Sequence, residues 1–484
     1  MPLDRRRFLE LGAASAVAPL ASCSRPSPPT APKADYTVHI ADTRIELAPG
    51  VEVSTTAYNG QVPGPLIRLT EGRPVTVDIV NDTARPEQVH WHGQKVGVDV
   101  DGSAEEGTPY VAAHASRRIS FTPGPAGLRF YHTHLIAGGD LTAGQYSCQV
   151  GPVYIDPRHE PGRYDREVFL TLKEFEPSLS QGGDMDMDFL AGEPDPALKT
   201  QGERAMKASL ARGMPKGYEV GYKHFAINGR MLGHGAPIQV KAGERLMLHV
   251  LNGSAGEIRS LALPGHVFQV VALDGNPLAT PIEVPVLWLG AAERISAIVE
   301  MNHPGVWVLG DTSDDDRGHG MGIVVEYAGA GGGAQWIKPP ASKWDYSRFG
   351  QAAGLARPPD QVFDMTIVKD NAALKGFNRW TINGVAFDDA HMSPMFRLSQ
   401  GRRYRIRMAN ASDDIHPIHL HRHSFELTHI HGRPTAGVLK DVVMLGGYQK
   451  LEIDFTADNP GRTLFHCHQQ LHMDFGFMCL FDYI

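Results

Sequence analysis

Residues 461–468 read Gly-Arg-Thr-Leu-Phe-His-Cys-His, a run that ends with one cysteine between two histidines. Residues 127–134 read Gly-Leu-Arg-Phe-Tyr-His-Thr-His, and residues 305–312 read Gly-Val-Trp-Val-Leu-Gly-Asp-Thr. In each run a glycine precedes a short stretch rich in apolar and aromatic residues. The chain therefore contains three copies of one unit, and this internal repeat determines the expected fold.

Three further anchors recur in each copy: an Asn-Gly pair, a glycine, and an asparagine nine residues after that glycine. Residues 404–408 lie between the last two anchors of the third copy and read Tyr-Arg-Ile-Arg-Met. This alternation predicts a half-buried strand. The anchors are Asn59-Gly60, Gly72 and Asn81; Asn228-Gly229, Gly243 and Asn252; and Asn383-Gly384, Gly401 and Asn410.

The repeat predicts three all-β sandwich domains, because short strands separated by turn residues are typical of sandwiches. A length of 484 residues, with 52 glycines and 35 prolines, fits that architecture. We expect domains at residues 35–157, 165–327 and 360–484. The Gly- and Pro-rich residues 328–359 are expected to link the second domain to the third.

The His-Cys-His run predicts copper, because imidazole and thiolate suit copper and a His₂Cys set is typical of a blue-copper centre. Successive side chains of a strand point to opposite faces. His466 and His468 should therefore face one way and Cys467 the other.

A second histidine run occupies residues 416–421 and reads His-Pro-Ile-His-Leu-His. The same alternation places His419 and His421 on one face and lets His416 face the other. One pair of strands can thus hold two metal sites back to back. His416 and Cys467 would serve the first site.

Two more His-x-His pairs lie early in the chain, at His90 and His92 and at His132 and His134. The four pairs supply eight imidazoles, more than one tetrahedral metal needs. The sequence therefore predicts a cluster of several metals, shared between the first and third domains. The second domain is expected to bind no metal, because the counterparts of the 416–421 histidines are Arg259, Ala262 and Pro264.

Charge and cysteine content bound the partners. The formal net charge is −8 and no basic block lies beyond the extreme amino terminus, which makes nucleic acid an unexpected partner. Of four cysteines, Cys467 is assigned to metal and Cys23 to processing. Cys148 and Cys479 are interpreted as buried free thiols, with a disulfide in an oxidising compartment as the alternative.

The amino terminus predicts export. Residues 4–9, Asp-Arg-Arg-Arg-Phe-Leu, resemble a twin-arginine export signal, and residues 11–20 are an apolar run too short for a permanent membrane span. We expect residues 1–22 to be a signal peptide read by the twin-arginine export machinery. The mature protein would be periplasmic or held at the cell envelope.

Leu-Ala-Ser precedes Cys23 and resembles a lipobox, which would leave Cys23 as a lipid-modified first residue. Plain cleavage nearby is the alternative. Residues 23–34 are rich in Pro and Ser and are expected to form a tether. The protein would then touch a membrane only through this lipid anchor.

The motifs His-Trp-His-Gly at residues 90–93, His-x-His at 132–134, His-x-x-His-x-His at 416–421 and His-Cys-His-x-x-x-His at 466–472 occur in this order. Together with three repeats they resemble the three-domain multicopper oxidases of the laccase and cuprous-oxidase kind, over essentially the whole mature chain. The resemblance implies three cupredoxin-like Greek-key β-sandwich domains.

The resemblance also implies four copper ions per chain, one of type 1, one of type 2 and two of type 3. A substrate would give up single electrons at type 1, and dioxygen would be reduced to two waters at the other three coppers. Carried over by position, the implied ligands are His416, Cys467 and His472 for type 1; His90 and His419 for type 2; and His92, His132, His134, His421, His466 and His468 for type 3.

Three positions near these motifs carry further expectations. Phe477 stands ten residues after the cysteine, where bacterial cuprous oxidases have a methionine, so the type 1 copper should lack a thioether ligand and have a raised potential. The alternative is a bulge that brings Met478 to the copper. Asp101 matches an acid that relatives place beside the cluster, where it would relay protons. A turn-forming Asp-Gly pair is the alternative.

The expected reducing substrates are phenols or aromatic amines. Alternatives are a metallo-oxidase of Cu(I) or Mn(II) and a copper-free envelope scaffold built of cupredoxin repeats. Retention of every expected ligand disfavours the scaffold. Three repeats and two complete His-x-His pairs in the first copy disfavour a copper nitrite reductase. Met185 and Met187, in an acidic insertion, would bind extra copper or belong to a mobile loop.

Overall fold

The computed structural model describes residues 33–159, 162–180, 188–213, 216–352 and 357–484. Residues 35–484 form one compact unit. The expected signal peptide, Cys23, Met185 and Met187 lie outside the described residues. No helix in the described ranges is both long enough and apolar enough to span a membrane.

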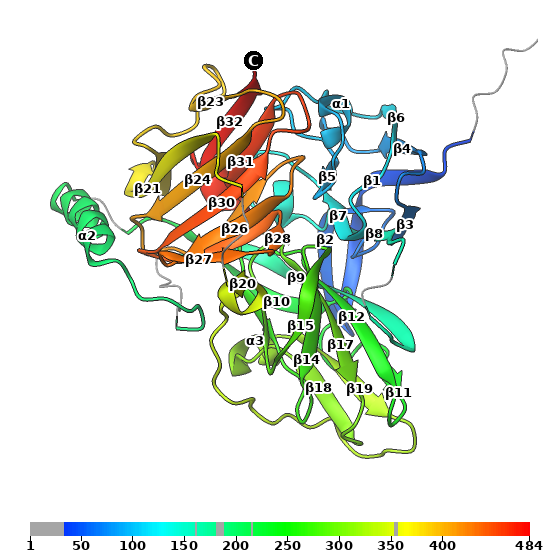
Figure 1. The fold of residues 1–484 in the computed structure, drawn as a ribbon. Helices are drawn as coiled ribbons and strands as arrows, with labels where there is room; N and C mark the ends of the chain where they lie inside the picture. The colour runs from blue at the N-terminus through cyan, green and yellow to red at the C-terminus, as the bar shows by residue number, and fades with distance from the viewer. Residues whose placement is uncertain (1–32, 160–161, 181–187, 214–215, 353–356) are drawn as a thin grey trace, which may run out of the picture. The chain divides into compact units, whose positions relative to one another are not determined.

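The first copy is a pair of four-stranded sheets, ordered β2-β1-β4-β6 and β3-β8-β7-β5 (Figure 1, blue to cyan). Its core contains the buried side chains of Val77, Ile79 and Trp91. The elements are β1 Tyr36–Ala48, β2 Val51–Tyr58, β3 Ile67–Thr70, β4 Val75–Asn81, β5 His90–His92, α1 Val98–Asp101, β6 Ser116–Phe121, β7 Gly127–His132, the 3-10 turn η1 Gly144–Tyr146 and β8 Val150–Asp156.

The second copy has a six-stranded sheet, β10-β9-β12-β17-β14-β15, facing the smaller sheets β11-β19-β18 and β13-β16. Helix α2 follows β9, and the sequence analysis did not predict it. Asp195 caps this helix by accepting hydrogen bonds from the amides of Ala197 and Leu198. The elements are β9 Arg166–Ser180, α2 Pro196–Ala211, β10 Glu219–Ile227, β11 Ile238–Val240, β12 Arg245–Asn252, β13 Arg259–Leu261, β14 Phe268–Leu273, β15 Asn276–Val284, β16 Leu287–Leu289, β17 Arg294–Glu300, β18 Val306–Gly310, α3 Asp314–Gly318 and β19 Gly322–Tyr327.

The third copy has one large sheet, β20-β27-β26-β30-β24-β21-β22 with β28 beside β26, and a second sheet, β23-β32-β31-β25-β29 (Figure 1, yellow to red). Its first strand, β20, lies in the expected linker. The elements are η2 Tyr346–Phe349, β20 Gln351–Ala352, β21 Gln361–Leu374, β22 Phe377–Ile382, β23 Met395–Leu398, β24 Arg403–Asn410, β25 His416–Leu420, β26 Phe425–Ile430, β27 Arg433–Ala436, β28 Leu439–Lys440, β29 Val442–Leu445, β30 Lys450–Thr456, β31 Thr463–Cys467, α4 Gln470–Asp474 and β32 Met478–Tyr483.

The repeat seen in the sequence is a repeat of topology. The predicted strand between the glycine and asparagine anchors is β4, β12 or β24, and in each copy it pairs in parallel with the copy's first long strand, β1, β9 or β21. Asn59, Asn228 and Asn383 each adopt a positive φ, at 53°, 51° and 54°, which the tight hairpin turn requires. The prediction of an all-β chain is confirmed.

The closing asparagine of each anchor set organises the loop that precedes β5, β13 or β25. In the third copy Asn410 is fully buried, and its Nδ2 donates to the carbonyls of Asp414 and Gly446. Asn81 and Asn252 do the same at equivalent loops. Because buried amide groups need partners, this side chain fixes the path by which the chain enters β5, β13 or β25.

Candidate metal centre

Strand pairing brings the two histidine runs of the third copy together. Strands β25 and β31 are antiparallel, with His419 opposite His466 and Ile418 opposite Cys467. Residues opposite each other in a sheet point to the same face. The His419 and His466 side chains therefore share one face, and Cys467 points to the other.

A three-residue group forms on the Cys467 face. The Cys467 Sγ lies 3.6 Å from His416 Nδ1 and 3.5 Å from His472 Nδ1, and these two nitrogens lie 3.0 Å apart. All three side chains are buried. One sulfur and two imidazole nitrogens at the corners of a small triangle form the donor set of a blue-copper site.

The other face carries the eight-histidine cluster, to which the first copy contributes four side chains and the third copy four. Strand pairing places His90 opposite His132. Ligand atoms within 4.8 Å of one another define three sets of three: His90, His92 and His419; His92, His132 and His468; and His134, His421 and His466. Every set contains histidines from both copies.

Most rings of the cluster are held by one nitrogen and present the other. The Nδ1 atoms of His90, His419 and His132 lie 3.0, 2.7 and 2.7 Å from the Asp101 carboxylate, the Asp441 carbonyl and the Thr133 carbonyl. Their Nε2 atoms are buried and lack a hydrogen-bond partner among the described residues. Metal-binding histidines have this arrangement, with an outer partner that fixes the tautomer and frees the other nitrogen.

Burial also keeps these rings in the form that binds metal. It lowers the pKa of His134 to about 3. Desolvation lowers the pKa of His92, His132, His416, His419, His421, His466, His468 and His472 well below the usual histidine range. The imidazoles are neutral and keep a lone pair for a metal ion. Burial raises the pKa of the Cys467 thiol, so a metal ion that binds there must release its proton.

Asp101 lies beside the cluster. Its Oδ2 is 3.0 Å from both His90 Nδ1 and His421 Nδ1, and the side chain is fully buried. Asp101 thus joins a histidine of the first copy to one of the third.

Sequence reasoning missed Glu106. Its Oε1 lies 3.3 Å from His421 Nδ1 and accepts a hydrogen bond from the Leu464 amide at 2.7 Å. Burial, and then the charge of Asp101, raises its pKa well above the usual glutamate range. The only signal was its place five residues after Asp101, in a stretch without a motif.

Sequence reasoning also missed Asp441. Its Oδ1 lies 3.1 Å from His92 Nε2, and both of its oxygens accept hydrogen bonds from Arg294 at 2.6 Å. Arg129 donates a further bond at 3.1 Å. Because Arg129 belongs to the first copy, Arg294 to the second and Asp441 to the third, this buried carboxylate joins all three copies beside the cluster.

Phe477 packs against the cysteine-containing group. Its ring centroid lies 4.8 Å from that of His416, edge to face, and its carbonyl accepts a hydrogen bond from the Cys467 amide. Met478 pairs with His466 and packs in a separate apolar cluster with Leu464. The Phe477 ring therefore packs on the cysteine-containing group, and Met478 packs in the neighbouring apolar cluster.

The other two cysteines in the part of the chain that the structure describes are free. Cys148 and Cys479 are buried and unpaired, as the free-thiol interpretation predicts. Burial raises the pKa of Cys148 to about 11, so this thiol is protonated at neutral pH.

Comparisons with known proteins agree with this geometry. Three family models described as multicopper oxidase match residues 39–160, 199–327 and 357–483. Multicopper oxidase MmcO of Mycobacterium tuberculosis is 29% identical, over 99% of this chain and 97% of that protein. Laccase-4 of Thanatephorus cucumeris is 25% identical, over 88% and 85%.

Among solved structures, that of Fet3p, a multicopper oxidase that functions in iron import, superposes with a TM-score of 0.73. The superposition covers 93% of this chain and 90% of the Fet3p chain, and the two sequences are 17% identical. This similarity is one of fold. The three family models together span most of the chain, and the histidine groups fit type 1, type 2 and type 3 copper sites. The chain therefore belongs to the multicopper oxidase family, as a three-domain, copper-dependent oxidase that uses dioxygen.

Proposed function

We propose that this oxidase takes single electrons from phenols or aromatic amines and reduces dioxygen to two waters. Four copper ions per chain would supply the electron transfer and dioxygen chemistry. His416, Cys467 and His472 would hold type 1. His90 and His419 would hold type 2. His92, His132, His134, His421, His466 and His468 would hold the type 3 pair.

The observation that carries the proposal is the register of β25 and β31. It places Cys467 in one group while its sequence neighbours His466 and His468 enter the other. An electron arriving at the Cys467 sulfur can therefore pass to the eight-histidine cluster through a few covalent bonds.

The protein itself orients ligands and excludes water. The ring of Trp380 packs 4.0 Å from that of His472 and donates its indole N–H to Asp414 at 3.0 Å. His472 is 2% exposed, so bulk water is kept from the site. The Asp101 Oδ2 lies 3.0 Å from the Nδ1 atoms of His90 and His421, and we propose that Asp101 relays protons during dioxygen reduction.

Oxidation of Cu(I) or Mn(II) is the second candidate. A structural relative, Fet3p, functions in iron import, which supports a metal-ion substrate. The likeness to Laccase-4 supports the organic substrate. Oxygen uptake by the copper-loaded protein should be compared with a phenol, Cu(I) and Mn(II). We expect uptake with the phenol; uptake with a metal ion alone would favour the second candidate, and none with all three would contradict an oxidase.

We further propose export by the twin-arginine machinery and a lipid anchor at Cys23, on the strength of the amino-terminal sequence alone. The domain limits would be residues 35–157, 165–327 and 360–484, with 328–359 between the last two. Cell fractionation with a Cys23→Ala variant tests the anchor. A variant that stays with the membrane fraction would contradict it.

A further inference from the structure

A small cavity lies against two histidines of the eight-histidine cluster, His132 and His468. Its volume is about 10 Å³, room for about one water molecule. Five polar side chains form part of its wall: Gln145, Ser147, Gln149, Asn252 and Ser254. Among the described residues, the Gln149 Oε1 and the Ser254 Oγ are buried without a hydrogen-bond partner. A water molecule there would find the partners that it needs.

A buried carboxyl group lies behind this cavity. The Gln149 Nε2 donates to the Glu87 Oε2 at 3.3 Å and to the Ser147 Oγ at 3.3 Å. Glu87 is fully buried. It precedes His90 by three residues and belongs to none of the four histidine motifs.

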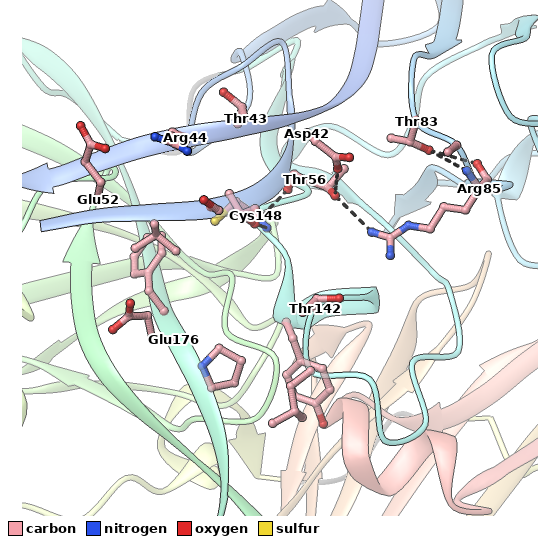
Figure 2. Close-up of a pocket in the computed structure, with 18 residues that line it drawn as sticks. Asp42, Thr43, Arg44, Glu52, Thr56, Thr83, Arg85, Thr142, Cys148 and Glu176 are labelled. Carbon is pink, nitrogen blue, oxygen red and sulfur yellow. Dashed lines mark hydrogen bonds between the residues drawn. The ribbon is translucent and has the colours of Figure 1, made fainter.

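The other carboxyl oxygen of Glu87, Oε1, is connected by hydrogen bonds to residues of an open pocket. Arg85 Nε donates to the Glu87 Oε1 at 2.8 Å, and Arg85 Nη2 donates to the Thr56 Oγ1 at 3.1 Å. The Thr56 hydroxyl donates to Asp42 at 2.7 Å. Asp42, Thr56 and Arg85 line an open pocket of about 1040 Å³, and Figure 2 shows the hydrogen bonds that connect them. Polar groups thus run from the open pocket to the buried cavity.

The charges around Glu87 suit a group that gains and loses a proton. Burial raises the pKa of its carboxyl, and the hydrogen bond and charge of Arg85 oppose that rise. Asp42, on β1, raises the pKa further. Tyr58, on β2, also faces Glu87, and burial keeps this phenol protonated by raising its pKa.

We propose that Glu87 supplies protons to the dioxygen-reducing cluster through the cavity beside His132 and His468. The inference rests on the proposed function. Reduction of one dioxygen to two waters takes four electrons, which come from the reducing substrate, and four protons. Glu87 breaks its carboxyl O–H bond and passes the proton inward. The carboxylate, stabilised by Arg85, then regains a proton from bulk solvent by way of the open pocket that Arg85 lines.

Gln149 controls the inward step. Its amide N–H holds the Glu87 carboxyl, and its free Oε1 can accept a hydrogen bond from a water molecule in the cavity. When the amide turns away, that water bridges the carboxyl to the cavity and carries the proton. Glu87 acts through this water and is a positioning and proton-supplying residue that touches no reacting atom.

The test uses Glu87→Gln, which keeps the shape of the side chain and cannot carry the proton, and Glu87→Asp, which can. Glu52→Gln, at an exposed carboxyl of the same pocket, is the matched control. Stopped-flow measurements on the copper-loaded protein follow reduction of the blue band without oxygen and then its return with oxygen. We expect unchanged reduction in Glu87→Gln, re-oxidation slowed roughly tenfold or more with a larger solvent deuterium isotope effect, and recovery in Glu87→Asp.

A second readout needs no copper. Infrared titration of the copper-free protein should show a protonated carboxyl that persists above the usual glutamate range, is absent from Glu87→Gln and is present in Glu52→Gln. Wild-type re-oxidation and isotope effect in Glu87→Gln would overturn this inference alone, as would an infrared titration identical to that of the wild type. A wild-type protein that consumes no dioxygen would instead overturn the proposed function.

Discussion

The second and third copies share a backbone and differ in chemistry. In the third copy His419 pairs with His466 across β25 and β31. In the second copy the counterparts of these residues, Ala262 and Gly310, form the same kind of antiparallel bridge. The sandwich therefore does not need a metal ion to form this pairing, and the copper chemistry depends on side chains placed on a shared frame.

The site of the cysteine-containing group shows the same contrast. His416 and His472 face each other in the third copy, with their Nδ1 atoms 3.0 Å apart. Their counterparts in the second copy are Arg259 and Asp316, which form an ion pair at 2.9 Å. The second copy fills the place of a metal ion with opposite charges. A buried charge needs a partner of opposite charge. At the same place the third copy has two neutral imidazoles, whose nitrogen lone pairs can bind a metal ion.

The largest expected effect comes from removing the thiol of the third copy. Cys467→Ser should abolish the blue absorption band and reduce substrate oxidation to background, because the hydroxyl is a poor ligand for this copper. Optical spectra, copper content and oxygen uptake check the prediction. Cys479→Ala, at another buried free thiol, is the control and should keep both band and activity. An unchanged band in Cys467→Ser would contradict the assignment.

The next effect concerns the buried ion pairs of Asp441 with Arg129 and Arg294, which join the three copies. Asp441→Asn should lower the free energy of unfolding by about 3–5 kcal/mol, because it removes the carboxylate that Arg129 and Arg294 share and leaves Arg294 only Asp274, at 3.7 Å. Urea unfolding measures the loss. Asp458→Asn, at an exposed ion pair with Lys95, is the control and should cost at most about 1 kcal/mol. Equal losses of unfolding free energy in the two variants would contradict the claim that Asp441 stabilises the contact between the copies.

A smaller loss is expected in the second copy. Asp316→Asn weakens the partner of Arg259 and should cost about 1–3 kcal/mol, because Asp316 is only partly buried and Glu257 remains nearby. Copper content and oxidase activity should stay unchanged. Asparagine at the equivalent position of the third copy, in His472→Asn, should remove the blue band. A loss of copper in Asp316→Asn would contradict the claim that the second copy takes no part in copper binding.

The smallest effect is a shift in redox potential. Phe477→Met should lower the potential of the type 1 copper, because a thioether beside the sulfur favours the oxidised metal relative to a phenyl ring. Redox titration of the blue band measures it. Met478→Leu, in the neighbouring apolar cluster, should leave the potential unchanged. A potential that stays unchanged or rises in Phe477→Met would refute the role of Phe477.

The sequence predicted the parts of the molecule that follow local patterns. Strand β24 was predicted from the alternation of apolar and polar residues between its two anchors. The opposite orientations of the Cys467 and His466 side chains follow from the two-residue period of a strand. Glu106, Asp441 and Glu87 were not predicted, because each acts through contacts far apart in the chain. Helix α2 and strand β20 were also not predicted, since neither lies in the segments whose pattern recurs in the three copies.

The central claim is that the first and third copies share a cluster of copper ions while the second binds none. Anomalous X-ray diffraction at the copper absorption edge, on crystals of the copper-loaded chain, tests it most directly. We predict three copper peaks among the eight histidines, a fourth between His416, Cys467 and His472, and no peak beside Arg259. Fewer than three peaks in the cluster, or a peak in the second copy, would contradict the account.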